Sequence, residues 1–312
     1  RDADLSTTMI SRPARMHIAH GRFAAPAKVN FGLRILGKRP DGYHTIQTVL
    51  QMLNLCDWLT VHPNDGGTIQ LTCIPSTLPT GDGNLIVRAA RLLQQTFQVQ
   101  QGVEITLYKH IPIAAGLGGG SSNAATTLLV LNHAWHLHCR PATLHRLAAQ
   151  LGSDVPFFLG GPTALACGRG EVLSPVTPPP PLTGMLVNPG FGVSAGWAYG
   201  QFARQSSATD LTISNILEGL RNHDLTLLAD VMVNDLELGV VAVYPIIRRM
   251  QEALRAMGAL VTFMSGSGPT VGGLFPPTVD LQAVERSLRR QATWTVMPFA
   301  TLSQSFHPEL RG

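Results

Sequence analysis

The glycine-rich segment Gly116–Ser122 (GLGGGSS) has the residue types that point most directly to chemistry. It lies between a strand expected to end at Lys109 and a helix expected from Asn123 to about His136. A glycine-rich turn that opens a helix directs backbone N–H groups outward at the positive end of the helix dipole, where phosphate oxygens bind. A tight turn that lets a helix pack on a strand would need fewer glycines and no serines. The segment therefore predicts a phosphate-binding loop.

The spacing around this loop excludes three common nucleotide-binding signatures. A dinucleotide-binding fingerprint would need a glycine where Ser121 stands, and a ribose-binding acid, yet Ile105–Ser153 contains no Asp or Glu. A Walker P-loop would need a lysine at the end of the loop, whereas the lysines of this chain, Lys28, Lys38 and Lys109, all precede it. The motifs of protein kinases are also missing.

The elements that position the loop begin with strands. Polar and apolar residues alternate from Lys28 to Ile35, which predicts a half-buried strand with Lys28 and Asn30 on one face. Further strands are expected around Ile46–Met52, Trp58–His62, Ile69–Cys73 and Val103–Leu107. The opening of the chain is therefore expected to be largely β-structure.

Helix start and stop signals organise the middle of the chain. Asn84 is expected to cap a helix that carries an apolar stripe to Phe97. Pro141–Leu151 is expected to form a helix that Gly152 ends, so that Asp154 emerges directly beyond the helix.

The proline-rich stretch Pro175–Pro181 is the best candidate linker, and an α+β second half is expected beyond it. Its expected elements are helices near Leu225–Val233 and Pro245–Met257, a strand Ala259–Met264, a second glycine loop Ser265–Thr270, a further strand after that loop, a helix from Asp280 and a last strand near Trp294.

Five motifs together resemble a known family. Pro112–Ser122 resembles the ATP-binding loop of the GHMP kinases, the superfamily of galactose, homoserine, mevalonate and phosphomevalonate kinases. The other four motifs are Ala25–Asn30 (APAKVN), Arg39–His44 (RPDGYH), Leu151–Phe158 (LGSDVPFF) and Ser265–Pro269 (SGSGP). These four resemble the members that phosphorylate a cytidine-diphosphate-linked methylerythritol, and the Pro-Asp-Gly-Tyr-His stretch is specific to those members.

The resemblance implies an ATP-dependent small-molecule kinase that phosphorylates the 2-hydroxyl of this substrate in the non-mevalonate isoprenoid pathway. It assigns Asp154 the role of general base, which takes the proton of the acceptor hydroxyl. Lys28 would lie beside Asp154, hold the carboxylate ionised and offset developing negative charge. These residue types suit phosphoryl transfer, in which a protein mainly positions the acceptor, neutralises phosphate charge and accepts a proton.

The resemblance also implies the binding residues. ATP is expected to contact Asn84, Lys109, Pro112, Gly116, Leu117, Gly118, Gly119, Gly120, Ser121 and Ser122, with Asn84 and Lys109 at the adenosine end. Mg²⁺ is expected between the phosphate oxygens without a dedicated protein metal site, because it keeps most of its water.

The substrate is expected to contact Asn30, Tyr43, His44 and Tyr199. Tyr43 could stack on the cytosine ring and His44 could bind its polar edge, whereas Asn30 could instead be a plain strand-surface amide. One position departs from the family: Ala195 stands where Thr is common, so no hydroxyl is available there.

The implied fold is a two-domain α/β (α+β) GHMP kinase fold. Its N-terminal ATP-binding domain, ribosomal-protein-S5-domain-2-like, is expected over residues 23–175, and its C-terminal substrate-binding domain, ferredoxin-like, over residues 176–312. The active site is expected in the cleft between them. Residues 1–22 are expected to be a tail, either an artificial remnant or a processed end.

Composition agrees with a folded enzyme of small molecules. The 312 residues are 45% hydrophobic and 13% charged, and the net charge of +4 comes without a polybasic run, so a phosphorylated small molecule is a more natural partner than nucleic acid. No apolar run is long enough to span a membrane. The four cysteines are far apart, which indicates a reducing cytoplasm, and a monomer or homodimer is expected.

The histidines around residue 136 do not indicate a metal site, and two rival functions fit the sequence less well. His133, His136, His138 and Cys139 have no carboxylate nearby, so no metal is expected there. Another GHMP kinase, of the mevalonate or homoserine type, would keep the ATP loop but has no need for Tyr43 and His44. A nucleotide-binding regulatory protein without catalysis would need neither Lys28 nor Asp154.

Overall fold

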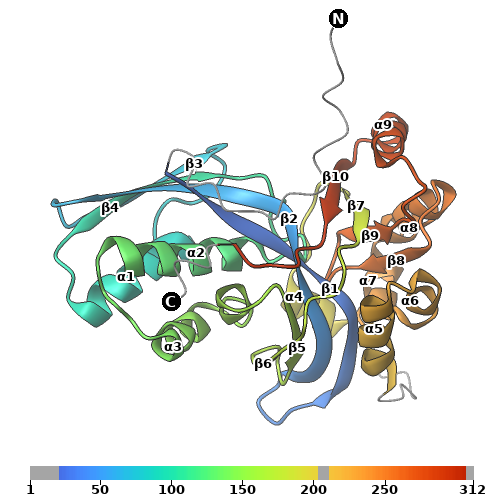
Figure 1. The fold of residues 1–312 in the computed structure, drawn as a ribbon, viewed down its shortest axis with the longest axis horizontal. Coiled ribbons are helices and arrows are strands. Elements are labelled where there is room, and N and C mark those ends of the chain that lie inside the picture. The colour runs from blue at the N-terminus through green and yellow to red at the C-terminus, as the bar shows by residue number, and fades with distance from the viewer. Residues whose placement is uncertain (1–20, 203–210, 307–312) are drawn as a thin grey trace, which may run out of the picture.

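Two β-sheets organise the part of the chain that the computed structural model describes, residues 21–202 and 211–306 (Figure 1). The six-stranded sheet has the order β3-β4-β2-β5-β6, with β1 paired to β2, and the four-stranded sheet has the order β10-β7-β9-β8. Residues 1–20, most of the expected tail, lie outside the described residues. The mixed α/β fold class is confirmed, whereas the domain boundaries after residues 22 and 175 stay a prediction.

A long hairpin dominates the first sheet. Its strands are β1 (Arg22–Lys38) and β2 (His44–Asn64), followed by β3 (Ile69–Ile74), β4 (Gly102–Tyr108), β5 (Thr163–Cys167) and β6 (Val172–Pro175). One end of β2 pairs with β4 and the other with β5. The two separate strands expected around residues 46–52 and 58–62 are therefore one continuous strand, and β5 and β6 were not predicted.

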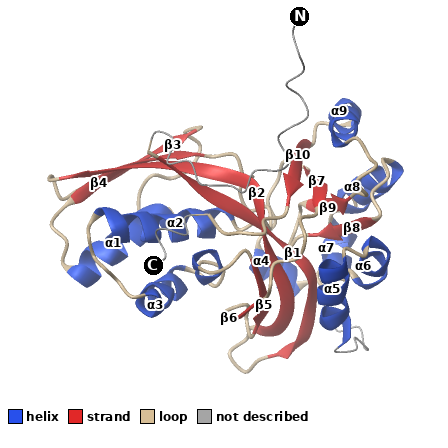
Figure 2. Cartoon of the chain, in the orientation of Figure 1, coloured by secondary structure: helices blue, strands red, loops and turns tan. Residues whose placement is uncertain are grey.

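Three helices and one 3₁₀ turn cover a face of this sheet (Figure 2). They are α1 (Leu85–Phe97), α2 (Gly119–Ala134), α3 (Pro141–Leu151) and η1 (Pro156–Leu159). The cap of α1 is confirmed, since Asn84 Oδ1 accepts a 3.0 Å hydrogen bond from the N–H of Ile86. The bounds of α3 are as expected, but α2 begins at Gly119 and not at Asn123.

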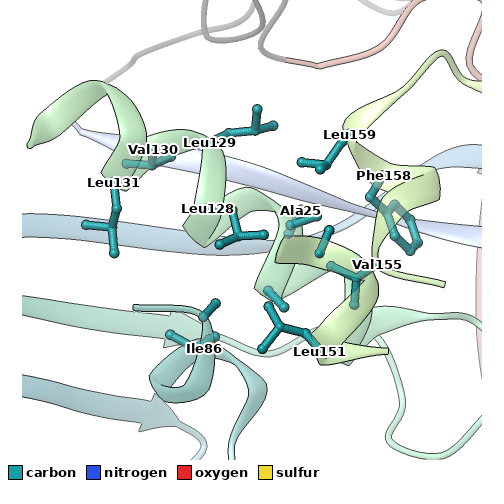
Figure 3. Packing of buried hydrophobic residues seen from close by; sticks show 14 of the residues in the cluster. Ala25, Ile86, Leu128, Leu129, Val130, Leu131, Leu151, Val155, Phe158 and Leu159 are labelled. Atoms are coloured by element: carbon teal, nitrogen blue, oxygen red, sulfur yellow. The ribbon is translucent and has the colours of Figure 1, made fainter. Parts of the chain in front are cut away.

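The start of α2 reflects tertiary packing. Glycine is a poor helix former, which is why the sequence favours a later start. Apolar side chains of α2 such as Leu128 and Leu131 lie in one cluster with Ile86 of α1, Leu151 of α3 and Val155 (Figure 3). This burial offsets the low propensity of the glycine-rich first turn.

The second sheet has a ferredoxin-like strand arrangement. Its strands are β7 (Thr183–Asn188), β8 (Val261–Met264), β9 (Val271–Leu274) and β10 (Thr295–Ala300), and all neighbouring pairs are antiparallel. The helices are α4 (Ala195–Gly200), α5 (Leu211–Asn222), α6 (Leu225–Val231), α7 (Glu237–Val243), α8 (Ile246–Ala256) and α9 (Leu281–Gln291). The sequence did not predict α4, α5 or α7. Within the described ranges, no helix combines the length and apolarity needed to cross a membrane.

Strand β1 belongs to the six-stranded sheet and also contacts the second half of the chain, beyond residue 175. The N–H of Leu33 donates to the Val233 carbonyl at 2.8 Å, and the N–H of Asp235 donates back to the Leu33 carbonyl at 2.9 Å. A buried cluster contains Phe31 of β1 together with Phe263 of β8, whose rings meet edge to face at 5.3 Å. The strand that carries Lys28 is therefore packed against both halves.

Candidate active site

Two cavities meet at the glycine loop. The larger has a volume of about 720 Å³ and the smaller about 330 Å³. Gly116, Gly118 and Ser121 line both. Two bound molecules could therefore approach each other at this shared wall, as a transfer reaction requires.

Lys28 is held at this junction by strand β1. Its side chain is 6% exposed, and Nζ donates to Asn30 Oδ1 at 2.7 Å and to the Gly116 carbonyl at 3.2 Å. The Asn30 amide in turn donates to Thr48 Oγ1 at 3.0 Å. The expectation that Lys28 and Asn30 share a strand face is confirmed, and the contacts fix the direction of the ammonium group.

Asp154 faces Lys28 from the turn between α3 and η1. Its Oδ2 lies 3.7 Å from Lys28 Nζ, and its side chain is 38% exposed in the larger cavity. The neighbouring Val155 and Phe157 are buried in the hydrophobic cluster that also contains Leu128 of α2 and Leu151 of α3. The backbone is thus anchored on one side while the carboxylate stays accessible, which suits a group that must accept a proton from a ligand.

The glycine loop presents the N-terminus of α2 to both cavities. The first intrahelical bond runs from the Ser122 N–H to the Gly118 carbonyl at 2.9 Å. The N–H groups of Gly119, Gly120 and Ser121 precede it in the first helical turn, so they are the groups that a phosphate can use. Gly118 has a φ of +68°, and a Cβ there would lie 2.9 Å from Lys28 Cγ.

The second glycine loop closes the site from the other half of the chain. Ser265 Oγ donates to the Gly116 carbonyl at 2.9 Å and accepts from the N–H of Asn30 at 3.3 Å. Gly116 has a φ of +78°, and a Cβ there would overlap the Ser265 carbonyl. The following residues, Gly266 and Ser267, line the larger cavity.

Asn234 supports this second loop and was missed by the sequence analysis. Its amide donates to the carbonyls of Met264 at 2.9 Å and Gly266 at 2.7 Å, while its Oδ1 accepts from the N–H of Leu236 at 3.0 Å. Asn234 lies outside every recognised motif, so no local signal marks it.

Aromatic rings line part of the larger cavity. His44 stacks on Tyr199, with ring centroids 5.5 Å apart and an angle of 17° between the planes. Tyr43 is 58% exposed, and the Arg169 guanidinium lies 4.8 Å from the centre of its ring. Burial raises the pKa of Tyr199 to about 12, with a further contribution from the charge of Asp154. Ala195 also lines this cavity, with a methyl group in place of a hydroxyl.

The smaller cavity contains the residues expected near the nucleotide. Asn84, Lys109 and Pro112 line it together with the glycines of the loop. The Asn84 amide donates to the Pro79 carbonyl at 2.9 Å, and Lys109 forms an ion pair with the buried Asp57. Both side chains are therefore already oriented by the protein.

All but two of the site residues expected from the sequence line one of the cavities. The exceptions are Leu117 and Ser122, which are buried and line neither. The Leu117 carbonyl instead accepts a 2.9 Å hydrogen bond from the N–H of Lys28. Asp57, Asn234 and Arg169 were not predicted from the sequence. Asp57 had a signal, since an acidic residue that interrupts the apolar stretch Leu53–Val61 is the kind of buried polar group that calls for a partner.

The described residues do not offer a metal site made by the protein alone. Nowhere in 21–202 or 211–306 do three or more His, Cys, Asp or Glu side chains come close enough to share an ion. Two side chains with oxygen atoms are candidate ligands: Ser121, which lines both cavities, and Asp154, which lines the larger one. This donor set suits Mg²⁺, which needs only one or two protein oxygens when phosphates supply the others.

Comparison with protein families finds two matches. Residues 84–162 match the GHMP kinases N terminal domain, and residues 216–293 match the GHMP kinases C terminal domain. The first match contains the glycine loop and Asp154, and the second contains the second glycine loop.

Curated relatives named 4-diphosphocytidyl-2-C-methyl-D-erythritol kinase match over most of the chain. The relative from Geobacter metallireducens is 40% identical over 89% of this chain and 97% of its own length. That from Pelotomaculum thermopropionicum is 42% identical over 92% and 98%. That from a Synechococcus strain is 44% identical over 86% and 89%.

Among solved structures, a cytidine-diphosphate-linked methylerythritol kinase matches this chain at a higher sequence identity and TM-score than a homoserine kinase and a mevalonate kinase do. A 4-(cytidine 5'-diphospho)-2C-methyl-D-erythritol kinase superposes with a TM-score of 0.77 at 34% identity, over 90% of this chain and 98% of its own. A homoserine kinase from Cytophaga hutchinsonii gives 0.67 at 18% identity, over 93% and 97%. The mevalonate kinase of Methanococcus jannaschii gives 0.68 at 12% identity, over 92% and 100%. The last two share the fold alone.

Proposed function

The chain belongs to the 4-diphosphocytidyl-2-C-methyl-D-erythritol kinase family of the GHMP kinases, and from that premise we propose that it transfers the γ-phosphoryl group of ATP to the 2-hydroxyl of that substrate. The observation that carries the proposal is the shared wall of the two cavities, where Lys28 and Asp154 face each other beside the N-terminus of α2. One cavity accepts the phosphoryl donor and the other the alcohol.

In the proposed reaction Asp154 accepts the proton of the attacking hydroxyl. The hydroxyl oxygen forms a bond to the γ-phosphorus, the bond from that phosphorus to the β–γ bridging oxygen breaks, and ADP leaves. Lys28 stays in place during this step because Asn30 and the Gly116 carbonyl hold its ammonium group. Its positive charge stabilises the negative charge that develops on the transferred group.

The smaller cavity is the proposed nucleotide site. The N–H groups of Gly119, Gly120 and Ser121 bind phosphate oxygens, and Asn84, which is expected at the adenosine end, lines the same cavity. Lys109 was expected at the adenosine end as well, but its ammonium group lies beside Gly119, so we assign it to the phosphates. Mg²⁺ is proposed to accompany the nucleotide, with Asp154 and Ser121 as the available protein oxygens; when bound, it would neutralise phosphate charge.

The part of the larger cavity that Tyr43, His44 and Tyr199 line is the proposed cytidine site. Tyr43 offers a ring face for stacking, and His44 offers one nitrogen donor and one acceptor for the polar edge of the base. Lys38, Arg169 and Lys28 line the same cavity and give it the positive charge that a diphosphate requires. Because Ala195 lacks a hydroxyl, we assign it no polar contact with the substrate.

We also propose that the enzyme works in the cytoplasm as a monomer or homodimer. The four cysteines are free thiols, and three of them are buried, which is compatible with a reducing compartment.

Product analysis tests the proposed function. The purified chain is incubated with Mg²⁺-ATP and the cytidine-diphosphate-linked methylerythritol, and the product is examined by ³¹P and ¹³C NMR, because the quaternary carbon at the 2-position carries no hydrogen. A new phosphomonoester coupled to the 2-position supports the proposal. Phosphorylation at another hydroxyl, or ADP formation without a phosphorylated alcohol, would contradict it.

A further inference from the structure

A carboxylate outside both cavities organises the residues around the nucleotide. Asp57 of β2 is fully buried and accepts hydrogen bonds from four donors. Its Oδ1 accepts from the N–H groups of His110 and Ile111, both at 2.8 Å. Its Oδ2 accepts from Lys109 Nζ and, at 2.9 Å, from Asn123 Nδ2.

These donors come from both sides of the glycine loop. Lys109, His110 and Ile111 lead from the end of β4 into the loop, and Asn123 lies in α2 just beyond it. A single carboxylate therefore ties the entrance of the loop and its helix to strand β2. Since a buried charge is costly unless it is paired and hydrogen-bonded, the Asp57 carboxylate needs these donors to stay in place.

The ion pair also determines where the Lys109 ammonium group lies. Lys109 lines the smaller cavity with its side chain only 10% exposed. A Cβ built on Gly119 would lie 2.8 Å from Lys109 Nζ. The ammonium group is thus held against the first turn of α2, where phosphate binding is proposed. A lysine has a long, flexible side chain, so a fixed partner is needed to keep its charge at one point.

We propose that Asp57 is a positioning residue of the kinase, which acts on nucleotide binding by holding Lys109 beside the N-terminus of α2. The inference rests on the proposed function, since it requires the smaller cavity to be the nucleotide site. Asp57 itself lines neither cavity and does not touch the ligand. Its effect on the nucleotide passes through the lysine.

Asp57→Asn tests the role with little change in shape. The amide oxygen can still accept from the two backbone N–H groups, but the amide nitrogen then faces the donors of Lys109 and Asn123 and releases the lysine. Binding of adenylyl imidodiphosphate, measured by calorimetry with Mg²⁺, is expected to weaken by about ten- to hundredfold. At saturating ATP, kcat and the KM for the alcohol are expected to stay within a few-fold.

Gln51→Leu is the matched control. Gln51 is also fully buried on β2, and its side chain forms three hydrogen bonds, to Met52, Thr163 and Leu302, away from both cavities. Loss of these bonds destabilises the same sheet without touching Lys109, so nucleotide affinity should be unchanged. An equal loss of affinity in both variants would mean that Asp57 is only structural.

Lys109→Met keeps the inference testable even if Asp57→Asn fails to fold, because the inference requires Lys109 to contribute to nucleotide binding. It should weaken analogue binding by a similar factor, and the double variant should bind no more weakly than Lys109→Met alone, because the carboxylate has no lysine left to hold. Native affinity in Lys109→Met, or additive losses in the double variant, would overturn the inference. Failure of the unsubstituted protein to bind the analogue would instead count against the proposed function.

Discussion

Lys28 Nζ lies 3.7 Å from Asp154 Oδ2, although one residue belongs to the first strand and the other to the turn after α3. The carbonyl of Gly116, in the glycine loop, accepts a hydrogen bond from the same ammonium group. The proposed base, the proposed charge-stabilising group and the proposed phosphate loop are thus joined by direct contacts. The predictions below follow from these contacts and from the residues that support them.

Asp154→Asn should lower kcat by about two to four decades, because the amide cannot accept the hydroxyl proton. Affinity for an ATP analogue measured without Mg²⁺ should stay within a few-fold, since the side chain lines the larger cavity and not the smaller one. Steady-state kinetics and calorimetry measure the two effects separately. Near-native turnover in the folded variant would mean that Asp154 is not the general base.

Gly118→Val should weaken ATP binding and leave the protein folded. The backbone at this residue has a φ of +68°, and a Cβ would lie 2.9 Å from Lys28 Cγ and 3.0 Å from Phe158 Cζ. A β-branched side chain is therefore strained there and displaces the loop. Gly161→Val is the control, because a Cβ at Gly161 has nothing within 4 Å. Equal nucleotide affinity in the two variants would mean that the glycine loop is not part of the nucleotide site.

Local sequence patterns predicted the placement of some residues that line the cavities, whereas the other expected site residues came from the resemblance to the GHMP kinases. Alternation along β1 places Lys28 and Asn30 on one face, and Asn84 has the residue type and position of a helix cap. The shared strand face of Lys28 and Asn30 and the cap at Asn84 follow from short-range geometry alone.

Residues that act through long-range contacts could not be found in this way. Asp57 meets donors near residues 110 and 123, and Asn234 meets the loop after β8, only because of how the chain folds. The start of α2 was misplaced for a related reason, since burial of the helix in the core overrides the low helix propensity of Gly119 and Gly120.

Asn234→Ala should reduce both stability and turnover. It leaves the buried carbonyls of Met264 and Gly266 without their side-chain donor, at a cost of about 1–3 kcal/mol in the free energy of unfolding. The second glycine loop then holds Ser265, and with it Gly116, less firmly. Asn64→Ala is the comparison, because the Asn64 side chain bonds only an exposed turn at Gly66. Denaturant unfolding and kcat should both distinguish the variants; equal behaviour of the two would argue against a supporting role for Asn234.

Tyr199 should make stability depend on alkaline pH. Its pKa is raised from 10.0 to about 12, so the folded protein keeps the phenol proton over a range in which the unfolded chain loses it. The stabilisation is complete below about pH 10 and is lost as the pH rises toward 12. Relative to Tyr199→Phe, the unsubstituted protein should lose roughly 2 kcal/mol of unfolding free energy over this range. Parallel stability curves for the two proteins would contradict the assignment.

Tyr43 and His44 should control the choice of substrate. Tyr43→Ala should raise the KM for the alcohol by about one to two decades, the usual effect of removing a stacking partner, and hardly change the KM for ATP. His44→Ala should reduce the preference for cytidine- over uridine-linked substrates, because the base edge loses its donor and acceptor. Comparison of kcat/KM for the two substrates in both proteins provides the measurement. A preference unaffected by His44→Ala would leave base selection to other residues.

The most direct test of the proposed activity is a coupled assay of ADP release with a panel of alcohols at saturating Mg²⁺-ATP. The panel contains the cytidine-diphosphate-linked methylerythritol, its uridine counterpart, mevalonate and homoserine. We expect kcat/KM to be highest for the cytidine-linked substrate and ADP release with mevalonate or homoserine to remain at background. Efficient turnover of mevalonate or homoserine, with background release for the cytidine-linked substrate, would contradict the account.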